Sequence, residues 1–89
     1  MVTLTSKFNE ATVKKGETFR IDLNEGGFVG AKWDLEIVSG KAKLVKTIPH
    51  SGNFGPVGRV FEAQDSGDIE IVAKGRPGGA KHTFKIKVN

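Results

Sequence analysis

The side chains that could act as nucleophiles or general bases are few, and their spacing forms no catalytic arrangement. The chain has no cysteine, which excludes a thiol nucleophile and a disulfide. None of its serines stands in the Gly-x-Ser-x-Gly setting that exposes a nucleophilic hydroxyl. Of the two histidines, His50 lies in a predicted loop. His82 begins a predicted strand on its apolar side, where a histidine is more often a packed core residue than a base.

Metal and phosphate sites are no better supported. The histidines and carboxylates are scattered and do not show the spacing of a metal site. The phosphate-loop pattern Gly-x-x-x-x-Gly-Lys-Ser/Thr does not occur, and the glycines join predicted strands, so no helix N-terminus is available to hold an anion. We therefore expect a protein that is not an enzyme and that needs no cofactor and no metal.

One stretch indicates binding to another molecule instead. It spans residues 24–33, and its glycines are Gly26, Gly27 and Gly30. They enclose two large apolar residues, Phe28 and Val29. Glycine permits a positive φ and a close approach of another backbone, and an apolar pair on such a loop is hard to bury within its own domain. The stretch ends on the only tryptophan, Trp33, which we expect to anchor the core.

Period-two alternation governs the rest of the chain, and no window shows the spacing of an amphipathic helix. Alternating residues predict strands near 2–4, 11–14, 18–23, 32–38, 42–47, 59–64, 68–74 and 81–88. Short strands separated by frequent turn signals predict an all-β, antiparallel β-sandwich of seven to eight strands, in a single domain over residues 1–89. The final strand carries Lys81, Lys85 and Lys87 on one face, which would suit a sheet edge or a solvated face.

The predicted core combines the inward positions of these strands. Its members are Phe19, Ile21, Trp33, Leu35, Ile71, Phe84 and Ile86.

The glycines are unevenly distributed between the two ends of such a sandwich. Successive loops of an antiparallel sandwich alternate between its ends, so the loops after residues 23, 47 and 74 should share one end. They hold nine of the twelve glycines, whereas the opposite end has one glycine per turn. The same loops carry Phe28, Val29, Phe54 and Val57, and we predict the segment 49–58, which holds Phe54 and Val57, to be irregular. These loops are a candidate binding surface, or alternatively lids folded over the open end of the sandwich.

These three loops resemble those of the chagasin family of cysteine-protease inhibitors. The family has an Asn-Pro-Thr-Thr-Gly motif shortly before a tryptophan, and Gly30 and Trp33 match its spacing here. Its second loop is rich in glycine, as is the segment 52–58. Its third loop carries Arg-Pro-Trp; Arg76 and Pro77 match, and Gly78 replaces the tryptophan.

The resemblance implies an immunoglobulin-like sandwich that inhibits papain-like cysteine proteases by inserting the three loops into the active-site cleft. It implies a protein partner, and we expect a monomer. The partner-binding residues it implies are Gly26, Gly27, Phe28, Val29, Gly30, Phe54, Gly55, Pro56, Val57, Gly58, Arg76, Pro77 and Gly78.

Charge and composition leave two further functions open. The net charge of +4 is a mild indication of an acidic partner. Nucleic acid is less favoured, because aromatic content is only 8% and acidic residues alternate with basic ones on several predicted strands. An immunoglobulin-like structural or adhesion module, which binds another protein without inhibiting it, remains the alternative.

No segment resembles a signal peptide or a membrane span, so we expect no membrane partner and either a cytoplasmic protein or a mature exported domain.

Overall fold

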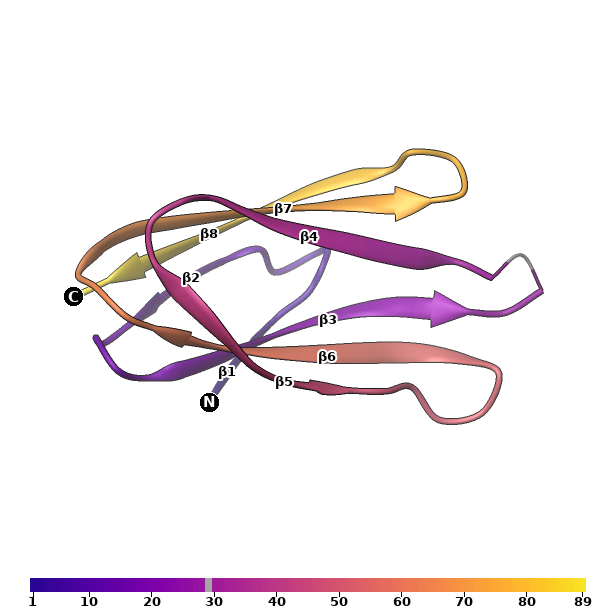
Figure 1. Ribbon diagram of the computed structural model, residues 1–89, viewed down its shortest axis with the longest axis horizontal. Helices are drawn as coiled ribbons and strands as arrows, with labels where there is room; N and C mark the ends of the chain where they lie inside the picture. The colour runs from indigo at the N-terminus through magenta and orange to yellow at the C-terminus, as the bar shows by residue number, and fades with distance from the viewer. Residues whose placement is uncertain (29) are drawn as a thin grey trace.

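The structure is a computed structural model that describes residues 1–28 and 30–89, and all of its regular elements are strands. The strands are β1 (Val2–Leu4), β2 (Glu10–Val13), β3 (Thr18–Gly26), β4 (Lys32–Ser39), β5 (Ala42–Ile48), β6 (Phe54–Ala63), β7 (Gly67–Arg76) and β8 (Lys81–Val88). They form two four-stranded sheets, in the orders β1-β3-β6-β5 and β2-β8-β7-β4 (Figure 1). The predicted all-β sandwich is therefore confirmed. Among the described residues, no helix of the length and apolarity needed to cross a membrane is present.

Each sheet contains one parallel pair, which the sequence did not predict. β1 runs parallel to β3, and β2 runs parallel to β8, while the other pairs are antiparallel. The reason is the connection between β1 and β2, which passes from one sheet to the other. The two short strands therefore lie along the edges of different sheets instead of forming a hairpin.

The core lies between the two sheets and follows the period-two pattern. Five of the predicted core residues keep 1% or less of their surface exposed: Phe19, Ile21, Ile71, Phe84 and Ile86. Trp33 and Leu35 pack against this cluster but are only partly buried, because β4 is an edge strand. Leu4 and Val13, from the two parallel edge strands, complete the core.

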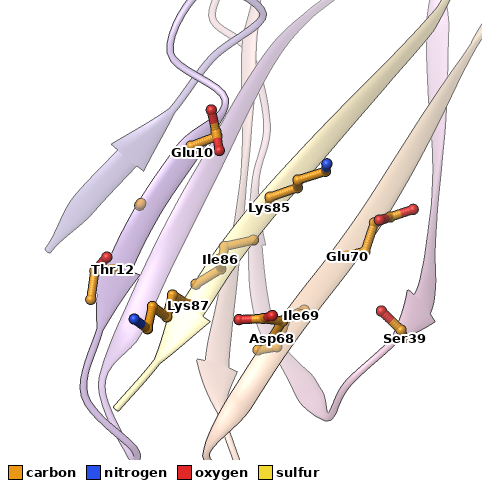
Figure 2. A pocket seen from close by; sticks show the side chains of 10 residues that line it. Glu10, Thr12, Ser39, Asp68, Ile69, Glu70, Lys85, Ile86 and Lys87 are labelled. Atoms are coloured by element: carbon orange, nitrogen blue, oxygen red, sulfur yellow. The ribbon is translucent and has the colours of Figure 1, made fainter.

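The last strand is not an edge, contrary to one of the two interpretations of its lysines. β8 lies between β2 and β7. Lys85 stands opposite Glu10 on one side and Glu70 on the other, and Lys87 stands opposite Asp68 (Figure 2). Opposite charges across a strand pair are stabilising. Lys85 and Lys87 thus belong to a solvated sheet face in which acidic neighbours compensate them, whereas Lys81 stands opposite Lys74.

Candidate protein-binding loops

The three glycine-rich loops lie at one end of the long axis of the molecule, as predicted (Figure 1). The domain measures 41 Å along this axis and 23 and 20 Å across it. The loops are the β3–β4 loop (27–31), the β5–β6 loop (49–53) and the β7–β8 loop (77–80). The strands that carry these loops lie side by side, because β3 pairs with β6, and β4 pairs with β7.

The β3–β4 loop is a tight tip closed by backbone hydrogen bonds. The N–H of Gly26 donates to the carbonyl of Ala31 at 2.8 Å, and the N–H of Ala31 donates back to Gly26 at 3.0 Å. Gly30 donates to Gly27 within the tip at 3.2 Å. The side chain of Phe28 is fully exposed, with a relative accessibility of 107%. It does not fold back as a lid. Val29 lies outside the described residues, so its predicted role stays a prediction.

The tip is held against the β5–β6 loop through its glycines. The N–H of Gly27 donates to the carbonyl of Asn53 at 2.6 Å. A Cβ on Gly26 would collide with the same carbonyl, and a Cβ on Gly27 would lie 3.1 Å from the ring of Phe54. Both glycines have positive φ, +94° and +81°. Neither position tolerates a side chain, so the two loops form one preorganised unit.

The segment 54–58 is a strand, and the predicted irregular loop there is wrong. β6 begins at Phe54, so Gly55, Pro56, Val57 and Gly58 pair with β3. β5 pairs with β6 only from Gly58 onward, which leaves the first residues of β6 with one neighbour. Proline is tolerated where one side of a strand is free. Val57 is only 5% exposed and contributes to the interior, whereas Phe54 is 55% exposed beside the tip.

The β7–β8 loop places Pro77 and Gly78 at the same end. Gly75 donates to Ala80 at 2.7 Å and accepts from Gly79 at 3.1 Å, which closes the loop. Arg76, the last residue of β7, points along the outer face of its sheet and forms a bidentate ion pair with Asp34 of β4. Its Nε lies 3.0 Å from Oδ2, and its Nη2 donates to Oδ1 at 3.2 Å.

A polar clamp that the sequence analysis missed ties the two sheets together below the loops. Glu25 of β3 and Arg59 of β6 form an ion pair at 2.7 Å, with side chains only 14% and 16% exposed. The carboxylate of Glu25 also accepts the backbone N–H of Trp33 at 3.1 Å, and Arg59 donates to the carbonyl of Trp33 at 3.0 Å. The available signal was two opposite charges at inward positions of adjacent strands.

The single tryptophan and the two histidines contact other parts of the domain. The indole N–H of Trp33 donates to the carbonyl of Asn24 at 3.0 Å, and its ring packs against that of His82 at a tilt of 33°, with centroids 5.1 Å apart. His82 therefore packs against an aromatic neighbour, but it is only partly buried and not part of the core. The ring of His50 lies beside Gly26, under the joined loops. Within residues 1–28 and 30–89, no group of three or more histidines and carboxylates could hold a metal ion.

Comparison with known proteins supports the fold. The sequence matches no protein-family model, and none of the curated proteins matches it. The structure is similar to that of EhICP2, a cysteine protease inhibitor from Entamoeba histolytica, with a TM-score of 0.78 and 18% identity over 99% of this chain and 95% of the other. It is also similar to the solution structure of amebosin, with a TM-score of 0.66 and 23% identity over 99% and 97% of the two chains. The chain therefore has the fold of a known cysteine protease inhibitor over nearly its whole length, and the sandwich implied by the resemblance to the chagasin family is confirmed.

Proposed function

We propose that this domain inhibits papain-like cysteine proteases by inserting its three loops into the active-site cleft. The observation that carries the proposal is the fully exposed Phe28, presented on a glycine tip that is hydrogen-bonded to the neighbouring loop. An exposed aromatic residue on a preorganised loop is the kind of anchor that dominates an interface. The similarity of fold to a cysteine protease inhibitor supports the target class, although fold by itself does not determine function.

In this mechanism the domain blocks the active-site cleft of the protease and catalyses no reaction itself. Gly26, Gly27 and Gly30 bring the backbone close to the catalytic cysteine of the protease without side chains that would clash. Phe28, with Val29, fills an apolar subsite, and Phe54, the first residue of β6, adds a second exposed aromatic side chain beside it. Gly55, Pro56, Val57 and Gly58 contribute by supporting that loop from within β6, since Val57 is buried.

The β7–β8 loop forms the other side of the wedge. Pro77 restricts the backbone before binding, which lowers the cost of ordering it. Arg76 contacts acidic or carbonyl groups at the rim and contributes mainly to the rate of association. Gly78 stands where the family motif has a tryptophan, so we expect binding weaker by roughly 2 kcal/mol or more than that of an inhibitor with the full motif.

The test is a titration of papain-like proteases with the wild type, Phe28→Ala and Arg76→Ala. Phe28→Ala should raise the inhibition constant by roughly 30-fold or more, and Arg76→Ala should slow association. Phe8→Ala is the matched control, because Phe8 is 54% exposed in the connection between β1 and β2. The bound inhibitor should also protect the catalytic cysteine of the protease from alkylation by iodoacetamide. The complex should contain one copy of each chain, as expected of a monomer.

Two results would contradict the wedge. One is the absence of inhibition at micromolar concentration, and the other is equal inhibition by the wild type and both loop variants. Hydrolytic activity of the purified domain, lost on changing His50 or His82, would contradict a non-catalytic role.

A second candidate function, a structural or adhesion module, is favoured by one observation. Ile37 and Val38 of β4 and Leu44 and Val45 of β5 are 36–52% exposed. Ile37 and Leu44 line one groove, together with Leu35 and Phe61. An exposed apolar groove is typical of protein contacts. This function takes the place of inhibition if the proteases are not inhibited.

A further inference from the structure

The outer face of the β2-β8-β7-β4 sheet has an excess of positive charge at the loop end and an excess of negative charge over the rest of its length. At the loop end, register places Lys32 opposite Arg76, and Lys74 opposite both Asp34 and Lys81. Directly paired residues point to the same face, and all five are exposed. Four cations and one carboxylate give this area, which we name the basic flank, a net charge of +3. The whole chain carries +4.

The remainder of the same face has the opposite balance. Register places four carboxylates there, with Lys85 and Lys87 between them; the carboxylates are Glu10, Glu36, Asp68 and Glu70. Figure 2 shows most of this acidic part, without Glu36, and has Lys85 between Glu10 and Glu70. Each lysine there has a carboxylate directly opposite, so this part of the face follows the rule that opposite charges pair across strands.

The basic flank departs from that rule. Lys74 and Lys81 are like charges directly opposite one another, and so are Lys32 and Arg76. Such pairs destabilise a sheet. Arg76 is compensated by Asp34, but Lys32, Lys74 and Lys81 form no ion pair within the part of the chain that the structure describes. The like-charged pairs are the last rungs of their ladders, immediately before the β3–β4 and β7–β8 loops.

We propose that the basic flank is a second contact surface, which docks on an acidic protein surface beside the cleft that receives the loops. This inference rests on the proposed function. When the loops enter a cleft, the outer ends of β4, β7 and β8 face the wall next to the β7–β8 loop. A cluster of uncompensated cations there attracts an acidic wall over several ångströms and orients the approach of the domain.

An acidic protein fits the basic flank better than nucleic acid does. The next row of the same face holds Glu36, Val72 and Thr83, with no aromatic side chain on which a base could stack. Asp34 lies within the cluster, where it would repel a phosphate. The aromatic residues Trp33 and His82 point to the other side of the sheet, toward the interior.

The experiment compares two double variants with the same loss of charge. Lys74→Gln/Lys81→Gln alters the basic flank, and Lys14→Gln/Lys15→Gln alters the turn between β2 and β3 at the opposite end. Association with papain-like proteases whose cleft rims are acidic is measured by stopped flow at low and high ionic strength. We expect association of the flank variant to be slower by about three- to tenfold at low ionic strength. The difference should vanish at high salt, and the turn variant should match the wild type.

Each alternative outcome has a separate meaning. Equal slowing of both variants would show that net charge alone acts, and unchanged rates in both would show that the flank makes no contact; either result overturns the inference while leaving the wedge intact. If no protease is inhibited by the wild type, the proposed function fails and the inference with it. Binding of a short DNA duplex that is lost in the flank variant would overturn the acidic-protein partner. Thermal unfolding verifies folding, and the flank variant should unfold close to the wild type, because it loses both the repulsion between Lys74 and Lys81 and the attraction between Lys74 and Asp34.

Discussion

Removing the carboxylate of Glu25 should destabilise the domain far more than an ordinary surface substitution. This carboxylate holds Arg59 at 2.7 Å and accepts the backbone N–H of Trp33, in a site where both charged side chains are about six-sevenths buried. Glu25→Ala leaves the guanidinium of Arg59 without its counter-ion. Breaking a fully buried pair costs about 3–5 kcal/mol. With the residual exposure of this one, we expect about 2–4 kcal/mol, or roughly 10–30 °C in the unfolding midpoint of a domain of this size.

The assay is urea unfolding of the wild type, Glu25→Ala, Arg59→Ala and the double variant. It is followed by the fluorescence of Trp33, the single tryptophan, which lies at the clamp. The coupling energy of the cycle should be at least about 1 kcal/mol. Glu25→Gln should cost less than Glu25→Ala, because its amide oxygen can still accept a hydrogen bond.

The pair Asp34–Arg76 supplies the matched control. It also joins two strands with bidentate geometry, but its side chains are 64% and 65% exposed. An exposed pair contributes about 0–1 kcal/mol. If the two cycles give the same coupling energy, burial does not strengthen the Glu25–Arg59 pair, and the clamp has no special role in holding the sheets together below the loops.

Two further substitutions test the core and the loop contact. Trp33→Ala should lower the free energy of unfolding by about 3 kcal/mol, the lower end of the range for a large aromatic truncation, because the ring is only partly buried. Circular dichroism during urea unfolding measures this loss. A solvent-like fluorescence emission of Trp33 in the native protein would count against it. Gly26→Ala should cost about 1–2 kcal/mol for its positive φ and more for the collision with the carbonyl of Asn53. Gly16→Ala isolates the first effect, since its φ is +88° and nothing lies within 4 Å of an added Cβ. Equal midpoints of thermal unfolding for the two glycine variants would refute the loop contact.

Much of the fold was evident in the local pattern. Alternation of apolar and polar residues identified the strands and five fully buried core residues, because in a strand the side chains of alternate residues share a face. The grouping of the loops also followed, since each antiparallel strand returns the chain to the opposite end. The positive φ expected of the glycines in the β3–β4 loop is present at Gly26 and Gly27, but their contact with the carbonyl of Asn53 in the same chain was not predicted.

The neighbours of each strand were decided only by the tertiary structure. Period two tells which face a side chain occupies but not which strand lies alongside. The parallel pairing of β1 with β3 and of β2 with β8, and the position of β8 inside its sheet, were therefore not predictable. For the same reason the sequence wrongly predicted Val57 in a loop, because the burial of Val57 depends on its pairing with Leu23 across the sheet. It also hid the clamp and the basic flank: Glu25 meets Arg59, and Lys74 stands beside Lys81, only because strands distant in sequence are brought into register by the shared core.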